Sequence, residues 1–425
     1  MPKKRIITNL RWYIAGLLFL STAINYVDRQ ALSFAFLKFG NQFHMDKQDF
    51  ARIGSAFQLA YAVMPILSGK IIDLLGTRAG LSIFVFWWSA AGIATAGGSS
   101  VFSFQALRFA LGLGEAGNWP GAVKAVAEWF PAKERAMASG IFNSGSSIGA
   151  VIAPLMLPVL IVTCGWRSAF VFTGALGFAW LVIWLLLYYA PEKHPHLSEE
   201  ELAHICEDSG AKPAAGPPVK WIELFRCRQL WGLLLGRVLS DPVWWFYATW
   251  MPKYLNDARG VDLQHMPLLA AIPFFTAGLG GFAGGTTSSY LVKKGWSVTK
   301  ARQSVLFMSS ALMIAGIPAV RTATTNGSVA FMAVATFAYA SFAANLIAVV
   351  TDVFPKYLMA SVYGIATTVA GFAGMGFTLL AGKLPYVQIF TLAGVLPLVA
   401  ATVFITMIGR VQHIELRRSG SAEVE

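Results

Sequence analysis

About twelve apolar stretches, each near twenty residues long, follow one another along this chain of 425 residues. A helix of about 20 apolar residues crosses a bilayer core about 30 Å thick. We therefore predict membrane spans near residues 12–37, 51–72, 79–99, 101–129, 137–163, 168–190, 228–254, 266–292, 303–320, 327–353, 359–382 and 387–409. Charged residues make up only 13% of the chain, about half of what a soluble domain carries. The pattern predicts an all-α membrane protein.

The net charge of +12 is explained by topology, because the Lys and Arg residues lie in short loops between apolar stretches. Most of these loops fall on one side of the membrane when both termini are placed in the cytoplasm. We expect a monomeric, multi-pass protein of a bacterial inner membrane, with both termini cytoplasmic and no nucleic-acid partner.

An internal repeat divides the chain. The stretch 128–131 (Glu-Trp-Phe-Pro) recurs as 352–355 (Asp-Val-Phe-Pro), and each is followed by a Gly-Ile pair. Repeats related by an axis along the membrane normal place a binding site between them. We predict two pseudo-symmetric six-helix bundles, with the following parts: residues 1–190, the first bundle; 191–226, a cytoplasmic linker; 227–409, the second bundle; and 410–425, a cytoplasmic tail.

Four charged residues fall inside predicted spans of the first half: Asp28, Arg29, Arg108 and Glu115. A charge at the bilayer centre costs about 2.5–3.5 kcal/mol on insertion scales. The structural alternative is a buried salt-bridge cluster, but such clusters contribute little to stability. We expect the arginines to bind a substrate carboxylate and the two acids to carry protons. A carboxylate that takes over an arginine would leave its former partner favouring protonation, which is proton symport.

The stretch 69–78 (Gly-Lys-Ile-Ile-Asp-Leu-Leu-Gly-Thr-Arg) resembles the signature loop between helices 2 and 3 of the major facilitator superfamily. The resemblance implies alternating access between two bundles, with Asp73 and Arg78 in a gating loop. The segment 25–29 (Asn-Tyr-Val-Asp-Arg) and the pair Arg108 and Glu115 resemble the anion:cation symporter branch. That branch implies sugar acids or other organic anions carried with protons, driven by the proton gradient without a cofactor.

Within this branch, the stretches 143–150 and 237–255 are most similar to hexuronate (glucuronate/galacturonate) transporters. The resemblance places Tyr26 and Tyr61 at the substrate, with Ser146 where sugar-acid members carry Gln. Trp244 and Tyr247 suit the faces of a pyranose ring, although one Trp of the 244–245 pair is expected to serve helix packing. We also expect Asp241-Pro242 to break its helix in mid-span.

The second half is otherwise poor in charge. Ser341 and Asn345 are four residues apart on one helix face, where they could bind substrate hydroxyls or join neighbouring helices. Thr367 and Thr368 are further polar candidates. We predict no metal site, because all six His lie in loops or at span edges and the three Cys show no metal-ligand spacing.

Other functions remain open at this stage. The same chemistry would suit an aldonate such as galactonate, or a tartrate-like diacid. A membrane sensor would need a soluble signalling domain, and the longest polar stretch is only the predicted linker. A membrane enzyme would need a nucleophile–base pair or a metal cluster within the spans. An open channel does not need buried charge pairs, and a passive uniporter does not need buried carboxylates.

Overall fold

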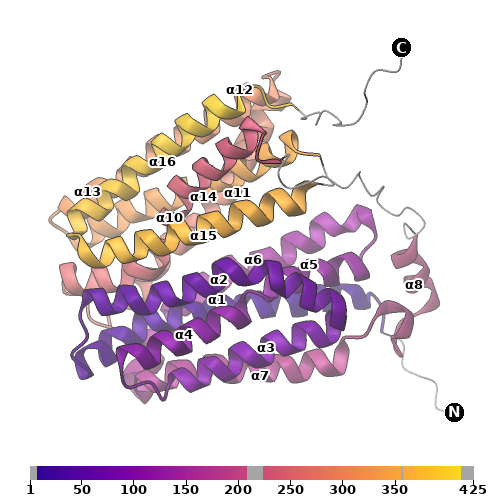
Figure 1. Ribbon diagram of the computed structural model, residues 1–425, viewed down its shortest axis with the longest axis horizontal. Helices are drawn as coiled ribbons and strands as arrows, with labels where there is room; N and C mark the ends of the chain where they lie inside the picture. Colours follow the sequence, from indigo (N-terminus) through magenta and orange to yellow (C-terminus); the bar gives the residue numbers. More distant parts are fainter. Residues whose placement is uncertain (1–6, 208–223, 356–357, 413–425) are drawn as a thin grey trace.

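The computed structural model describes residues 7–207, 224–355 and 358–412, and within these ranges it is helical, with no strand. The first half comprises α1 (Leu10–Gln42), α2 (Lys47–Leu75), α3 (Thr77–Thr95), α4 (Val101–Glu115), α5 (Asn118–Trp129), α6 (Ala132–Cys164) and α7 (Trp166–Leu187). The second half comprises α10 (Arg228–Arg259), α11 (Met266–Lys293), α12 (Val298–Leu312), η2 (Met313–Ala315), α13 (Gly316–Arg321), α14 (Thr325–Val353), α15 (Met359–Lys383) and α16 (Tyr386–Ile408). The two halves lie side by side (Figure 1).

All twelve predicted spans correspond to helices, and the predicted fold class of two six-helix bundles is confirmed. Two spans are interrupted. The fourth consists of α4 and α5, which are separated at Ala116 and Gly117, and the ninth consists of α12, η2 and α13. A Cβ atom at Gly117 would lie only 2.2 Å from the ring of Phe84 on α3. This close approach of the chain to α3 requires glycine.

The expected break at Asp241-Pro242 is wrong, because α10 runs unbroken from Arg228 to Arg259 with Pro242 inside it. Proline removes a single backbone donor, and neighbouring helices in a membrane protein make this loss tolerable. Pro242 is buried, so packing supports the helix at this point.

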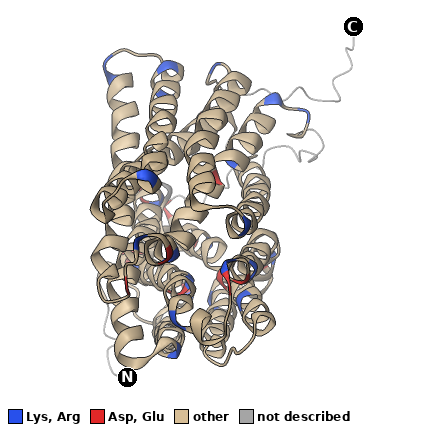
Figure 2. Ribbon diagram, turned by 90° about the vertical axis from the view of Figure 1, so that its left-hand side faces the viewer, with Lys and Arg blue, Asp and Glu red and all other residues tan. Residues whose placement is uncertain are grey.

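Within the described residues, seven helical stretches are long and apolar enough to cross a membrane, one of them the interrupted α12–η2–α13, and the bent α2 would add an eighth. Both α1 and α10 fail that test of composition, and each carries charged residues in its middle. Figure 2 shows that such positions are few, since most of the ribbon is tan. Both α1 and α10 contribute side chains to the site described below.

We call the end of the molecule where α7 finishes and α10 begins the linker end, and the other end the opposite end. At the opposite end one hydrophobic core joins both halves; it includes the ring contact between Phe50 and Trp250, with centroids 4.9 Å apart. Lys47 also donates across the halves to the carbonyl of Leu384 at 2.6 Å. Toward the linker end each half has its own separate core. The halves are therefore held together mainly at the opposite end.

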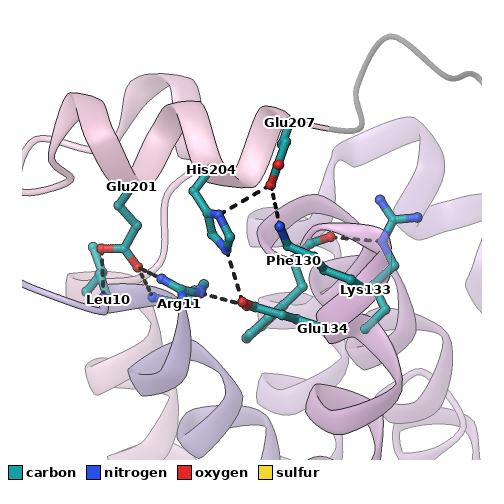
Figure 3. A network of polar contacts seen from close by, with 9 residues as sticks. Leu10, Arg11, Phe130, Lys133, Glu134, Glu201, His204 and Glu207 are labelled. Atoms are coloured by element: carbon teal, nitrogen blue, oxygen red, sulfur yellow. Dashed lines mark hydrogen bonds and ion pairs between the residues drawn. The ribbon is translucent and has the colours of Figure 1, made fainter.

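Two short helices follow α7 at the linker end: η1 (Pro191–Lys193) and α8 (Glu199–Cys206). Ser198 caps α8 by accepting a hydrogen bond from the Glu201 amide, as the Ser-Glu-Glu-Glu sequence predicts. Glu201 in turn accepts hydrogen bonds from the first amides of α1 (Figure 3). Thus α8 is fastened to the first half.

Candidate functional site

The centre of the site is an ion pair between α1 and α4. Nε and Nη2 of Arg29 donate to the same oxygen, Oε2 of Glu115, at 3.1 and 3.0 Å. Nη2 also donates to Oδ1 of Asn25, one turn earlier on α1. Glu115 has no exposed side-chain surface, whereas 13% of the Arg29 side chain is exposed. The arginine is therefore the member of the pair that a ligand can reach.

Four aromatic rings surround the Arg29 guanidinium. Its carbon lies 4.8 Å from the ring centre of Tyr26, 4.6 Å from Tyr61 and 5.3 Å from Phe57. The fourth ring, Trp245 at 5.4 Å, belongs to α10 in the second half. Such rings stabilise a cation through their negative faces. The cage thus joins the two halves around one positive charge.

A small cavity opens beside this cage and draws its walls from both halves. It is lined by Tyr26, Arg29, Gln30, Ala150, Trp244, Trp245, Ala248, Thr249 and Phe274. Aromatic faces dominate, while the Arg29 guanidinium, the Gln30 amide and the Thr249 hydroxyl supply polar groups. Its volume in this conformation is only about 20 Å³, which is room for about one water. The lining suits the chemistry of an anion with C–H surface and hydroxyl groups, and the halves would have to move apart to admit one.

The other two charged candidates of the first half, Asp28 and Arg108, form no ion pair within the described ranges. Oδ1 of Asp28 accepts a hydrogen bond from Thr173 on α7 at 2.7 Å, while Oδ2 meets no hydrogen-bond partner within the described part of the chain. Nη2 of Arg108 donates to the backbone carbonyl of Arg29, but its Nε and Nη1 atoms have no partner among the described residues. Both side chains are buried. Such bare, buried polar atoms are costly unless a proton, water or ligand satisfies them.

The remaining substrate candidates divide into two groups. Tyr26, Tyr61 and Trp244 lie at the cage or the cavity. The hydroxyl of Ser146 on α6 donates to the carbonyl of Asn143 in its own helix at 2.7 Å, and its contact with substrate stays a prediction. By contrast, Tyr247 is buried in the core that joins the halves at the opposite end, where its ring centroid lies 6.0 Å from that of Phe390. The structure does not bring Tyr247 to the cavity.

Ser341 and Asn345 share a face of α14, as predicted, but this face packs against other helices. The hydroxyl of Ser341 lies 2.8 Å from that of Ser309 on α12. The amide of Asn345 donates to the carbonyl of Gly284 on α11 at 2.9 Å. In this conformation both side chains join helices, and their binding of substrate stays a prediction.

The predicted gating loop lies at the linker end. Asp73 forms a 2.8 Å ion pair with Lys124 on α5, and the Arg78 guanidinium lies 3.9 Å over the ring of Tyr189. Both contacts are within the first half. The gating role of Asp73 and Arg78 is not tested by this arrangement.

Among the polar side chains that line the cavity, sequence reasoning missed Gln30 and Thr249. Gln30 follows Asp28 and Arg29 directly, so a run of three polar residues in an apolar helix was the available signal. Thr249 lies four residues after Trp245, which places both on one face of α10. As for metals, no group of three His, Cys, Asp or Glu side chains that could hold one occurs within residues 7–207, 224–355 and 358–412.

Comparison with known proteins gives concordant results. The model of the Major Facilitator Superfamily matches residues 18–379. The hexuronate transporter of Escherichia coli (strain K12) is 32% identical, over 97% of both chains. A probable galactarate/D-glucarate transporter of the same strain is 30% identical, over 98% of this chain and 99% of the relative. Among solved structures, a bacterial homologue of the human lysosomal transporter Spinster has a TM-score of 0.75 at 19% identity, and it covers 94% of this chain and 97% of its own.

Proposed function

This chain belongs to the major facilitator superfamily, a family of membrane transporters, and we propose that it carries a sugar acid with one carboxylate, such as a hexuronate, together with a proton across a bacterial inner membrane. The observation that carries the proposal is the Arg29–Glu115 pair, a ligand-accessible cation held by a fully buried acid. The hexuronate transporter that shares 32% identity over nearly the whole length supports the substrate class.

Coupling follows from competition for Arg29. A substrate carboxylate that binds the guanidinium displaces Glu115, because both occupy the same donor edge formed by Nε and Nη2. Glu115 would then be a buried carboxylate without a counter-charge, which costs several kcal/mol. Binding a proton removes that cost. Substrate and proton therefore each favour the binding of the other, as linkage requires.

Asp28 is a second proton carrier in this scheme. It is fully buried, and its hydrogen bond from Thr173 satisfies only one carboxylate oxygen. Protonation of Asp28 would remove the free-energy cost of burying an unpaired charge. Arg108 lies beneath the cage, with its guanidinium carbon 4.9 Å from the ring centre of Phe57. Its positive charge would favour the ionised form of Asp28 after the substrate has left.

The sugar ring would lie against the aromatic walls of the cavity. Trp244 and Trp245 offer flat faces to ring C–H groups, and the Gln30 amide and the Thr249 hydroxyl can bond ring hydroxyls. The carboxylate would point to Arg29, which approaches the cavity from the first half. Each half would thus recognise a different part of the substrate.

The arrangement of the halves supports alternating access. The halves share a core at the opposite end and have separate cores at the linker end. Lys and Arg are concentrated in the loops of the linker end, which we take as cytoplasmic, together with both termini. In this conformation substrate would exchange with the cytoplasm, and rocking of one half against the other would expose the site to the opposite side.

Uptake into proteoliposomes tests the proposal. Labelled glucuronate and galacturonate should accumulate, and a gradient that is acidic outside should increase accumulation. Galactonate and tartrate serve as competitors. Absence of hexuronate uptake would overturn the substrate assignment, and stronger competition by galactonate than by unlabelled hexuronate would move it to an aldonate. If accumulation of the labelled substrate is the same with and without the pH gradient, the proposed coupling to protons is wrong.

A further inference from the structure

A second ion pair lies inside the membrane, on α10 in the other half. Arg237 binds Asp241 one turn later, with Nε–Oδ2 and Nη2–Oδ2 distances of 2.8 and 2.7 Å. Its Nη1 donates to the hydroxyl of Thr367 on α15 at 3.0 Å, and its guanidinium lies 5.1 Å from the ring centre of Tyr363. The mechanism above uses none of these residues.

This pair faces the same way as the cavity wall. Arg237, Asp241, Trp245 and Ala248 follow one another at spacings of about one turn, so they form one stripe along α10. Trp245 and Ala248 line the cavity. Side-chain exposure is 13% for Arg237 and 16% for Asp241, so both are partly accessible within a helix that spans the membrane.

The offset along α10 between Arg237 and the residue that contacts Arg29 is comparable to the length of a particular class of ligand. Trp245 is in contact with the Arg29 guanidinium, and Arg237 precedes Trp245 by eight residues, which is about 12 Å along a helix. The carboxyl carbons of an extended six-carbon diacid are roughly 6 Å apart, and each carboxylate–guanidinium contact adds about 4 Å. The reach of a sugar diacid with both contacts therefore exceeds this offset of about 12 Å along α10, whereas a hexuronate has a carboxylate at one end only.

We propose that Asp241 masks Arg237 and thereby makes this transporter select sugar acids with one carboxylate over sugar diacids. This inference rests on the function proposed above. Asp241 occupies the Nε–Nη2 edge of Arg237, and Thr367 occupies Nη1. A second carboxylate arriving here meets a cation whose charge is already neutralised and whose donors are in use.

Asp241 differs from Glu115 in its surroundings. Glu115 has no exposed side-chain surface, so it needs a proton once it is displaced from Arg29. Asp241 is partly exposed and can keep its charge when displaced, because water solvates it. A diacid would then leave two like charges near one arginine, which is unfavourable. The same type of pair therefore admits a carboxylate at Arg29 and excludes one at Arg237.

Asp241→Asn tests the inference by unmasking Arg237. Purified wild-type and variant protein are titrated with glucuronate, galactonate, galactarate and glucarate, and the dissociation constants are measured by isothermal titration calorimetry. In the wild type, diacids should bind at least 10-fold more weakly than the best monoacid. In Asp241→Asn, diacid affinity should rise about 10-fold or more, while monoacid affinity changes less than 3-fold. The double variant Arg237→Gln/Asp241→Asn should lose this gain.

Asp257→Asn is the matched control. Lys253 and Asp257 form the same i,i+4 ion pair on the same helix, toward the opposite end. This variant should keep the wild-type ratio of monoacid to diacid affinity. Wild-type protein that binds diacids as well as monoacids would overturn the inference, as would an Asp241→Asn variant with unchanged diacid affinity. If no monoacid binds to the wild type, the proposed function itself fails, which is a separate result. Should Asp241→Asn not fold, Asp241→Ser provides the same unmasking.

Discussion

Arg29 on α1 and Glu115 on α4 form a 3.0 Å ion pair in which the acid is completely buried and the base is not. This asymmetry predicts the behaviour of Glu115→Gln. The neutral amide cannot hold a proton, so substrate binding should lose most of its dependence on pH. Accumulation driven by a pH gradient should be abolished, while exchange of labelled for unlabelled substrate across the membrane continues. Binding titrations at several pH values and counterflow assays measure the two effects. If substrate binding by Glu115→Gln depends on pH as strongly as binding by the wild type does, the coupling scheme is wrong.

Replacing Arg29 by Lys keeps the charge but removes the two-donor edge and the planar group between the rings of Tyr26 and Tyr61. Hydrogen bonds to charged groups contribute about 1.5–3 kcal/mol, so substrate affinity should fall by roughly 10-fold to 100-fold. Arg52→Lys is the control, because 56% of the Arg52 side chain is exposed and it lies near the start of α2. Titration of each purified variant gives the dissociation constants. Equal affinity in Arg29→Lys and the wild type would remove Arg29 from the substrate site.

Close packing of α1 against α6 predicts a stability difference between two glycines of α6. A Cβ at Gly149 would lie 2.4 Å from the carbonyl oxygen of Ala23, whereas a Cβ at Gly140 meets nothing within 4 Å. Gly149→Ala should destabilise the protein by about 1–3 kcal/mol, because neither backbone can move freely. Gly140→Ala should be neutral or slightly stabilising, since Ala favours a helix more than Gly does. Thermal unfolding in detergent measures both, and equal midpoints would refute the packing argument.

The fold was predictable because span length is set by the bilayer, and each apolar stretch of about 20 residues has few alternatives to a helix. Local interruptions were harder. The break between α4 and α5 depends on the approach of Gly117 to Phe84, which is a contact between helices and leaves no periodic pattern in the sequence. The prediction at Pro242 was wrong because it relied on local helix propensity alone. Packing of the buried Pro242 within the bundle keeps α10 continuous.

The candidate site could be predicted in part. The cost of charges in a membrane identified Arg29 and Glu115 without any structure. The pattern could not say which residues would pair, because pairing depends on the direction in which each helix faces its neighbours. Asp28 turns toward Thr173 on α7 instead of toward an arginine. Likewise, Ser341 and Asn345 do share one face, but this face meets α11 and α12. Arg29 and Trp245 belong to different halves, and the internal repeat in the sequence does not indicate which residues of the two halves come into contact.

The closed opposite end predicts the effect of adding bulk between the halves. A Cβ at Gly382 on α15 would lie 2.5 Å from the Cβ of Ala51 on α2, whereas a Cβ at Gly376 on the same helix meets nothing within 4 Å. Gly382→Val should therefore open this end, and Gly376→Val should not. A cysteine introduced at Thr249, in a background without the three native cysteines, reports the opening. Its labelling by an impermeant maleimide from the periplasmic side should increase several-fold in Gly382→Val alone. Equal labelling in both variants would show that this contact does not hold the halves closed.

The attachment of α8 to the first half predicts a stability effect at the linker end. Glu201 accepts hydrogen bonds from the amides of Leu10 and Arg11 and from the Arg11 guanidinium, and Glu134 binds the other side of that guanidinium (Figure 3). Glu201→Ala leaves the first amides of α1 without their acceptor and Arg11 without one of its two acids. We expect a loss of about 1–3 kcal/mol, seen as a lower midpoint of thermal unfolding.

Glu200→Ala is the control for this change, because Glu200 lies in the same first turn of α8 and its side chain is exposed. It removes an equal charge near the helix N-terminus, so any general effect on the α8 dipole appears in both variants. Only Glu201→Ala should also expose α8 to limited proteolysis, since Glu201 is the residue that fastens it to α1. If the two variants unfold and are cleaved alike, α8 does not depend on this contact. If Glu201→Ala alone is affected while substrate binding is unchanged, α8 stabilises the first half without taking part in recognition.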